Sequence, residues 1–141
     1  MPGPMEVWLA HRSISTLEMR LERQCRNAQL VAEYLLTRPD VSGVRYPGQT
    51  GDSSHQVASR QMEYYGPVVS FVLPDKTHAE KFLRSCKLVI KATSFGGVHT
   101  TAERRARWGG DVIPQGFIRL STGCEDGRDI VADIMQALDA G

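Results

Sequence analysis

Hydrophobic residues recur at helical spacing through the first forty residues of the chain. Pro4 stands near a first-turn position with apolar residues directly after it, which predicts a helix close to the amino terminus. Ser15, followed three residues later by Glu18, predicts a capping box that opens a second helix of about six turns, which Pro39 ends. The buried stripe expected on this second helix comprises Leu17, Leu21, Ala28, Val31, Ala32 and Leu35.

Short apolar and β-branched runs, bounded by glycine and proline, predict strands in the rest of the chain. These runs cover residues 41–48, 67–73, 88–90 and 116–122. Between them we expect a short helix capped by Asp52, Ser53 or Ser54, and a second helix opened by a capping box of Thr77 and Glu80. The last helix, within residues 125–138, is expected to bury Ile130, Val131, Ile134, Met135 and Leu138.

The strands are few, and the segments that join them have mixed lengths. This pattern favours an α+β fold, with one small, mostly antiparallel sheet and helices packed on one face, over a doubly wound parallel sheet. The other face of the sheet is then left uncovered, ready to pack against another domain. We expect residues 1–141 to form a single domain of this kind.

The strand at 116–122 offers the most specific candidate for binding chemistry. Because side chains alternate along a strand, Ile118 and Leu120 share the core face, while Phe117, Arg119 and Ser121 share the other. Arg119 is therefore held on a rigid element, facing away from the helices. A guanidinium group binds a carboxylate or phosphate through two parallel hydrogen bonds, although this spacing is also typical of a solvated or ion-paired surface arginine.

A loop rich in small and basic residues follows the strand at 88–90. Ser94 offers a hydroxyl group beside Gly96 and Gly97, whose freedom lets a ligand approach the backbone, although a plain connector has the same composition. His99 is a candidate general base or a structural histidine. The loop at 104–108 carries three arginines and a tryptophan, and indicates a nucleic-acid patch or, more simply, a solvated or subunit-contact loop.

The overall charge and the cysteine content argue against several functional classes of protein. A formal net charge of +1 argues against a dedicated nucleic-acid binder and against attraction to an anionic membrane. No apolar run approaches the roughly 20 residues of a membrane span. The three cysteines and four histidines are scattered, which predicts no metal site and reduced thiols in a cytoplasmic protein.

Several of these segments, read in order, resemble the carboxy-terminal domain of the cystathionine γ-lyase and γ-synthase family. They are PMEVWLAHRSISTLEMRLERQCRNAQLVAEYL, VRYPG, ASRQM, GPVVSFVL, SFGG and FIRLSTGCED. The resemblance covers almost the whole chain, and its specificity comes from the order and spacing of the segments. Members of this family are fold-type I pyridoxal-phosphate enzymes of cysteine and methionine metabolism.

The resemblance implies roles for three residues. Arg119 matches the family arginine that binds the α-carboxylate of the substrate, and Ser94 matches the loop serine that helps to hold it. Thr93 stands at the position before that serine, where the residue type is linked to the choice of reaction. The family has glutamate or tyrosine at this position, so threonine leaves the exact reaction open. Phe95 replaces the usual leucine of the loop.

The resemblance also implies that part of the enzyme lies outside this chain. The family lysine that forms a Schiff base with pyridoxal 5′-phosphate belongs to a larger preceding domain, and so do most groups that bind the cofactor. The chain is thus expected to be inactive alone, and to belong to a homotetramer that acts on a small sulfur amino acid, without nucleic-acid or membrane partners. The alternative is a free-standing small-molecule-binding or regulatory α+β module, which would bind amino acids unaided.

Overall fold

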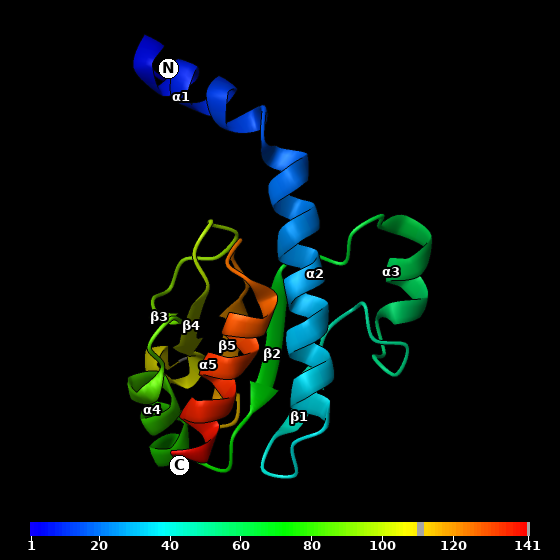
Figure 1. The fold of residues 1–141 in the computed structure, drawn as a ribbon, viewed down its shortest axis with the longest axis vertical. Coiled ribbons are helices and arrows are strands. Elements are labelled where there is room, and N and C mark those ends of the chain that lie inside the picture. The colour runs from blue at the N-terminus through cyan, green and yellow to red at the C-terminus, as the bar shows by residue number, and fades with distance from the viewer. Residues whose placement is uncertain (110–111, 141) are drawn as a thin grey trace.

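The structure of the chain is a computed structural model that describes residues 1–109 and 112–140. The elements follow one another as α1 (Pro4–Ile14), α2 (Leu17–Leu36), β1 (Ser42–Arg45), α3 (His55–Gln61), β2 (Val68–Val72), α4 (Lys76–Ser85), β3 (Ile90–Lys91), β4 (Thr101–Arg104), the 3-10 helix η1 (Arg105–Trp108), β5 (Phe117–Ser121) and α5 (Gly127–Asp139). Figure 1 shows α2 and α5 lying across the sheet, with α4 beside them.

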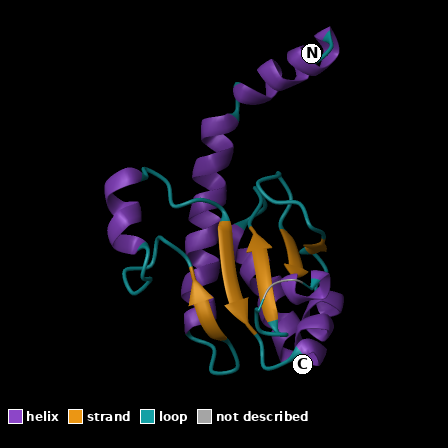
Figure 2. Cartoon of the chain, turned by 180° about the vertical axis from the view of Figure 1, so that it is seen from behind, coloured by secondary structure: helices purple, strands orange, loops and turns teal. Residues whose placement is uncertain are grey.

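The strands form one five-stranded sheet in the order β1-β2-β5-β4-β3. Neighbouring strands are antiparallel except β3 and β4, which are parallel. Figure 2 shows the sheet from behind, with the strands in front and the helices beyond them. The predicted α+β architecture, with helices on one face of a mostly antiparallel sheet, is therefore confirmed. We call the face turned away from the helices the open face.

The core lies between the sheet and the helices α2, α4 and α5. Ile118 and Leu120 of β5 are fully buried there, as the alternation of the strand predicts. The rings of Phe71 on β2 and Phe82 on α4 meet edge to face with centroids 5.7 Å apart. Because the core face of β5 is fixed in this way, Arg119 is turned to the open face.

Both predicted capping boxes are wrong. Ser15 closes α1 instead of opening α2, because its hydroxyl group donates to the carbonyl oxygen of Arg12 at 2.9 Å. At α4 the cap is Asp75, whose carboxylate accepts from the backbone N–H of His78 at 2.9 Å. Since this helix starts at Lys76, Thr77 lies inside its first turn and cannot cap it.

The predicted short helix is present as α3, but none of its three candidate residues caps it through a side chain. Ser54 is the N-cap residue, and its side chain makes no capping bond. Its hydroxyl and its backbone N–H both donate to Asp52, at 2.5 and 2.8 Å. The serine is therefore held by the turn that precedes the helix.

Most residues of the predicted buried stripes are buried or partly buried, but two residues at the edges of the stripes are exposed. Met135 of α5 is 44% exposed and Leu17 of α2 is 42% exposed. Met135 lies beside the stripe of Ile130, Ile134 and Leu138, which faces the sheet and the neighbouring helices. Leu17 belongs to the first turn of α2, which extends past the end of the sheet (Figure 1).

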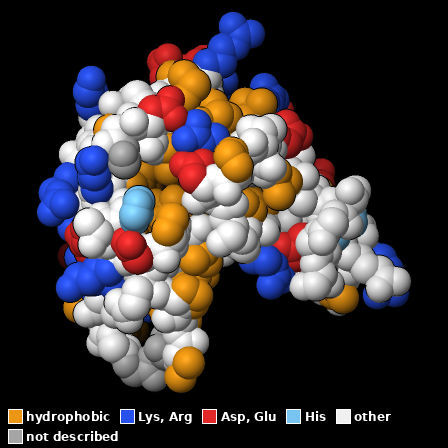
Figure 3. All heavy atoms as spheres, turned by 90° about the horizontal axis from the view of Figure 1, so that it is seen from below, with side chains coloured by type: hydrophobic (Ala, Val, Ile, Leu, Met, Phe, Trp, Pro, Cys, Tyr) orange, Lys and Arg blue, Asp and Glu red, His pale blue; other side chains and the backbone are white. Residues whose placement is uncertain are grey.

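Helix α1 projects away from the rest of the chain and has no buried residue (Figure 1). Within residues 1–109 and 112–140, no helix combines the length and the apolar character that crossing a bilayer requires. Figure 3 shows lysine and arginine side chains spread over one end of the molecule, with acidic side chains among them. This mixture fits the formal net charge of +1.

Candidate functional site

Arg119 occupies the middle of the open face. In the register of the sheet it lies opposite Ser70 of β2 on one side and Glu103 of β4 on the other. Its side chain is 21% exposed. The central strand β5 therefore fixes the base of the arginine, while its guanidinium group stays within reach of a ligand that approaches the open face.

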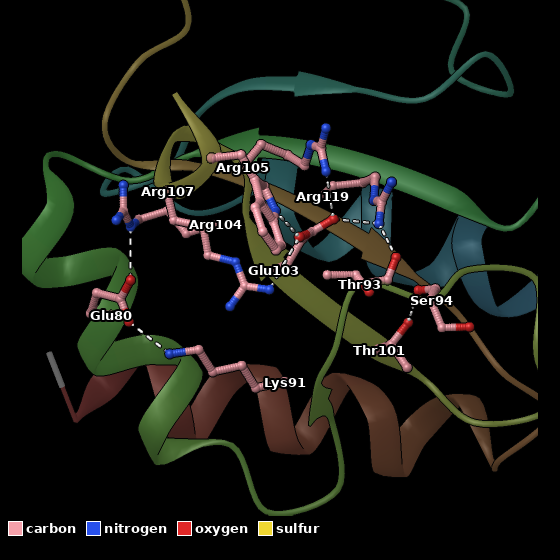
Figure 4. Close-up of polar contacts among 11 residues, drawn as sticks. Glu80, Lys91, Thr93, Ser94, Thr101, Glu103, Arg104, Arg105, Arg107 and Arg119 are labelled. Carbon is pink, nitrogen blue, oxygen red and sulfur yellow. Dashed lines mark hydrogen bonds and ion pairs between the residues drawn. The ribbon is translucent and has the colours of Figure 1, made fainter. Parts of the chain in front are cut away.

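The loop after β3 wraps around the Arg119 side chain. The Nη2 atom of Arg119 donates to the carbonyl oxygen of Thr93. The ring of Phe95 lies against the same guanidinium group, with the Arg119 Cζ atom 5.0 Å from the ring centroid. The structure thus brings two of the residues predicted from the sequence, Arg119 and Thr93, into direct contact (Figure 4).

Ser94 lies next in the loop but does not contact Arg119 through a hydrogen bond. Its carbonyl oxygen accepts from the Thr101 hydroxyl group of β4 at 2.7 Å. Among the described residues, no hydrogen-bond partner is found for its own hydroxyl group, and the residue is exposed. Ser94 therefore lies at the rim of the site with its hydroxyl group free to meet a ligand.

The glycine pair gives the loop its shape. Gly96 has a φ of +75°, a left-handed conformation that disfavours residues with a side chain. Its backbone N–H donates to the Ser121 hydroxyl group of β5 at 2.9 Å. Ser121 shares the open face with Arg119, so the same strand that carries the arginine also holds the loop beside it.

Two residues that sequence reasoning assigned to ordinary helical positions also hold this loop. The side-chain amide of Gln24, on α2, donates to the carbonyl oxygen of Gly97 at 2.5 Å. The carboxylate of Glu125 accepts from the Thr100 backbone N–H at 2.6 Å and from its hydroxyl group at 2.8 Å. The glycine loop is thus fastened by hydrogen bonds to α2, to β5 and to the segment before α5.

The most extensive polar contacts of the open face surround Glu103. Its carboxylate has no exposed surface, and it forms ion pairs with Arg105 at 3.0 Å, with Arg107 at 3.7 Å and with Arg119. The indole N–H of Trp108 donates to it at 3.0 Å. Figure 4 shows Arg105 and Arg119 turned toward Glu103. We call these five residues the Glu103 cluster.

The charge state of Glu103 follows from these contacts. Burial by itself raises the pKa of the carboxyl group, but the Trp108 N–H and the guanidinium groups of Arg105 and Arg119 outweigh it and lower the pKa below its usual value. Glu103 is thus an anion at neutral pH. One buried carboxylate compensates three guanidinium groups, so the cluster keeps excess positive charge.

The arginine-rich segment predicted to be a loop is divided between a strand and a short helix. Residues 101–104 form β4 and residues 105–108 form the 3-10 helix η1. Arg104 points to the helix side, where its Nε atom lies 2.8 Å from Glu80 of α4. Glu80 also pairs with Lys91, and these two partners lower the pKa of its carboxyl group to about 2.

The His99 side chain forms no hydrogen bond or ion pair with the other described residues. His99 is exposed in the glycine loop. In the part of the chain that the structure describes, histidine, cysteine, aspartate and glutamate nowhere gather in a group of three that could hold a metal ion.

Comparisons with known proteins identify the family and agree with this picture of the fold. A family model for Cys/Met metabolism PLP-dependent enzymes matches residues 1–139. A protein of Streptomyces coelicolor named "Putative cystathionine gamma-lyase" is 62% identical over 98% of this chain and 35% of its own length. A cystathionine beta-lyase of Lactococcus lactis is 37% identical over 97% of this chain and 39% of its own length.

Solved structures show the same fold. The O-acetylhomoserine sulfhydrylase of Wolinella succinogenes superposes with a TM-score of 0.93 and 31% sequence identity, covering 96% of this chain and 39% of that enzyme. The chain thus spans between 35% and 39% of the length of these relatives. The family model matches nearly the full length of this chain, so the chain belongs to the Cys/Met metabolism PLP-dependent enzymes.

Proposed function

We propose that the full-length protein is a pyridoxal-phosphate-dependent carbon–sulfur lyase of the cystathionine γ-lyase type. In this proposal residues 1–141 are its carboxy-terminal domain, which holds the α-carboxylate of a sulfur amino acid. The observation that carries the proposal is the position of Arg119. Its guanidinium group stands on the open face of the sheet, enclosed by the loop that carries Thr93, Ser94 and Phe95.

Among the described residues, no lysine lies beside Arg119 on the open face of the sheet (Figure 4). The chain has four lysines, Lys76, Lys81, Lys87 and Lys91. The first two lie on α4 and the third is exposed in the turn after it, on the helix side of the sheet. Lys91 pairs with Glu80 at 2.8 Å. None of these amines lies beside Arg119, so we assign pyridoxal 5′-phosphate and its lysine to the rest of the full-length protein, and this chain alone is inactive.

Within the complete enzyme, this chain contributes substrate positioning. Arg119 binds the α-carboxylate, and the Ser94 hydroxyl group donates a further hydrogen bond to it. A carboxylate held in this way fixes the direction of the bonds at the α-carbon, and such alignment supplies a large part of many rate enhancements. The open face and α1 are covered by the rest of a homotetrameric, cytoplasmic enzyme.

The reaction itself is proposed from the relatives. They bear the names of a γ-lyase, a β-lyase and a sulfhydrylase, which act at different bonds of related amino acids. The relative with 62% identity favours γ-elimination. Thr93 precedes the loop serine, at the position where the residue is linked to reaction choice in the family. Its carbonyl oxygen accepts from Arg119, which supports a place for Thr93 beside the proposed substrate carboxylate.

A substrate panel tests the proposed reaction. We expect the full-length enzyme to release ammonia and a keto acid from cystathionine faster than from methionine, homocysteine or an acylated homoserine. The measurement is keto-acid release for each compound, with the cofactor absorbance recorded in parallel. A protein that carries the cofactor and releases no keto acid from any of the four would contradict the lyase assignment.

A further inference from the structure

The Nη2 atom of Arg119 is already occupied in the structure. It donates to the Thr93 carbonyl oxygen and forms an ion pair with Oε1 of Glu103. A guanidinium group has two edges that bind a carboxylate through parallel hydrogen bonds, Nε with Nη2 and Nη1 with Nη2. Both edges include Nη2. A substrate carboxylate that binds Arg119 through two hydrogen bonds must therefore displace one of the present partners.

Glu103 is the partner whose presence opposes a second carboxylate. Two carboxylates that share one guanidinium group repel each other, and this repulsion is strong where water is excluded. The Thr93 carbonyl oxygen is uncharged and lies in an exposed loop, so it causes no comparable repulsion. An anion that binds Arg119 is therefore expected to displace Glu103 from its ion pair with the arginine.

Glu103 has other partners that can compensate its charge when Arg119 turns away. Oε1 accepts from Nη1 of Arg105 at 3.0 Å, and Oε2 accepts from the Trp108 indole N–H at 3.0 Å. Nη2 of Arg107 lies 3.7 Å from Oε2, and its guanidinium group stacks on the Trp108 ring at 4.6 Å. Release of Arg119 therefore leaves the buried carboxylate hydrogen-bonded and paired with two guanidinium groups.

We propose that Glu103 is an internal competitor of the substrate for Arg119. It occupies the arginine in the absence of substrate, and Arg105, Arg107 and Trp108 retain it when the substrate α-carboxylate takes its place. Glu103 is a positioning residue in this scheme, because it acts on the substrate only through Arg119. The inference rests on the proposed function, since it requires Arg119 to bind the α-carboxylate.

Steady-state kinetics of the full-length enzyme test the exchange with two substitutions that have opposite expected effects. Glu103→Gln keeps the shape of the side chain and removes its charge, so KM is expected to fall about fivefold with kcat within about twofold. Arg105→Gln removes the alternative guanidinium partner that lies nearer to Glu103, so Glu103 binds Arg119 more firmly and KM is expected to rise about threefold. Arg26→Gln is the control, because Arg26 pairs with the exposed Glu22 on α2, outside the Glu103 cluster, and KM should not change.

The outcomes separate this inference from the proposed function. A rise of KM in Glu103→Gln, while Arg119→Ala still weakens substrate use, would mean that Glu103 only orients Arg119 and would overturn the exchange. If Glu103→Gln does not fold, Arg105→Gln decides, because an unchanged or lowered KM contradicts the proposal. Unchanged kinetics in Arg119→Ala would overturn the exchange together with the assignment of Arg119 to the carboxylate.

Discussion

Replacement of Arg119 by alanine in the full-length enzyme is expected to lower kcat/KM for an α-amino-acid substrate by about 100-fold. A charge-assisted hydrogen-bonded contact contributes about 1.5–3 kcal/mol, and 1.4 kcal/mol corresponds to a factor of about ten. The loss follows from removal of the guanidinium group that faces the ligand side of the sheet. The cofactor absorbance is expected to stay as in the wild type, because Arg119 does not bind the cofactor in this proposal.

Arg119→Lys is the matched variant for this experiment. Lysine keeps the positive charge but lacks the planar pair of donors, so it should recover part of the loss and no more. Glu103 keeps its contacts with Arg105 and Trp108 in both variants, so the fold is expected to survive. Full activity in Arg119→Ala would remove the arginine from the substrate site.

Replacement of Asp133 by alanine is expected to destabilise the chain by about 3 kcal/mol, the largest structural effect that we predict. The carboxylate of Asp133, on α5, accepts the backbone N–H groups of Lys87, Leu88 and Val89 at 2.8, 2.9 and 2.9 Å. These groups belong to the turn between α4 and β3, and among the described residues no other hydrogen-bond acceptor is found for them. Urea-induced unfolding followed by circular dichroism measures the change.

The effect of Asp133 depends on pH in a defined direction. Burial raises the pKa of its carboxyl group, but the N–H groups of Val89, Lys87 and Leu88 outweigh burial and lower the pKa in the folded chain. The stabilisation is therefore complete above the unfolded value, about 3.9, and is lost as the pH falls through the lowered value. Asp129→Ala, on the same helix and exposed, is the control and should change stability little. Equal losses in the two variants would contradict the role of Asp133.

The face of the sheet on which Arg119 lies could be predicted from the alternation of side chains along its strand. Alternation along β5 places Ile118 and Leu120 in the core and Arg119 on the open face, because a strand has only two faces. The helix-and-strand order likewise predicts helices on one side of the sheet. The family resemblance then assigns a role to Arg119, and the family match makes the enzyme hypothesis stronger than that of a free-standing binding module.

The surroundings of Arg119 could not be predicted, because they depend on residues far apart in the sequence. Strand β4 contains Glu103 and Arg104, so it lacks the apolar alternation of a half-buried strand. Glu103 is covered because η1 folds back over it and brings Arg105 and Trp108 into contact with its carboxylate. The support of the glycine loop by Gln24 joins positions 73 residues apart, and no local pattern marks such a contact.

The alternation along β5 also makes Ser121 a residue that could be predicted to hold the loop. Ser121 shares the open face with Arg119 by the same alternation, and it accepts the backbone N–H of Gly96 at 2.9 Å. A hydroxyl group two residues from the proposed ligand-binding arginine is well placed to hold a loop over that face. For Glu103 the alternation of β4 becomes informative only when its pairing with β5 is known.

The most direct test of the carboxylate assignment changes the substrate and the enzyme together. The measurement is kcat/KM for the best amino-acid substrate and for its α-carboxamide analogue, in the wild type and in Arg119→Ala. Our account predicts that the amide is used about 100-fold less well by the wild type, but only about threefold less well by Arg119→Ala, because the variant has lost the partner of the carboxylate. The same factor in both enzymes would show that the carboxylate is bound elsewhere, and would contradict the account.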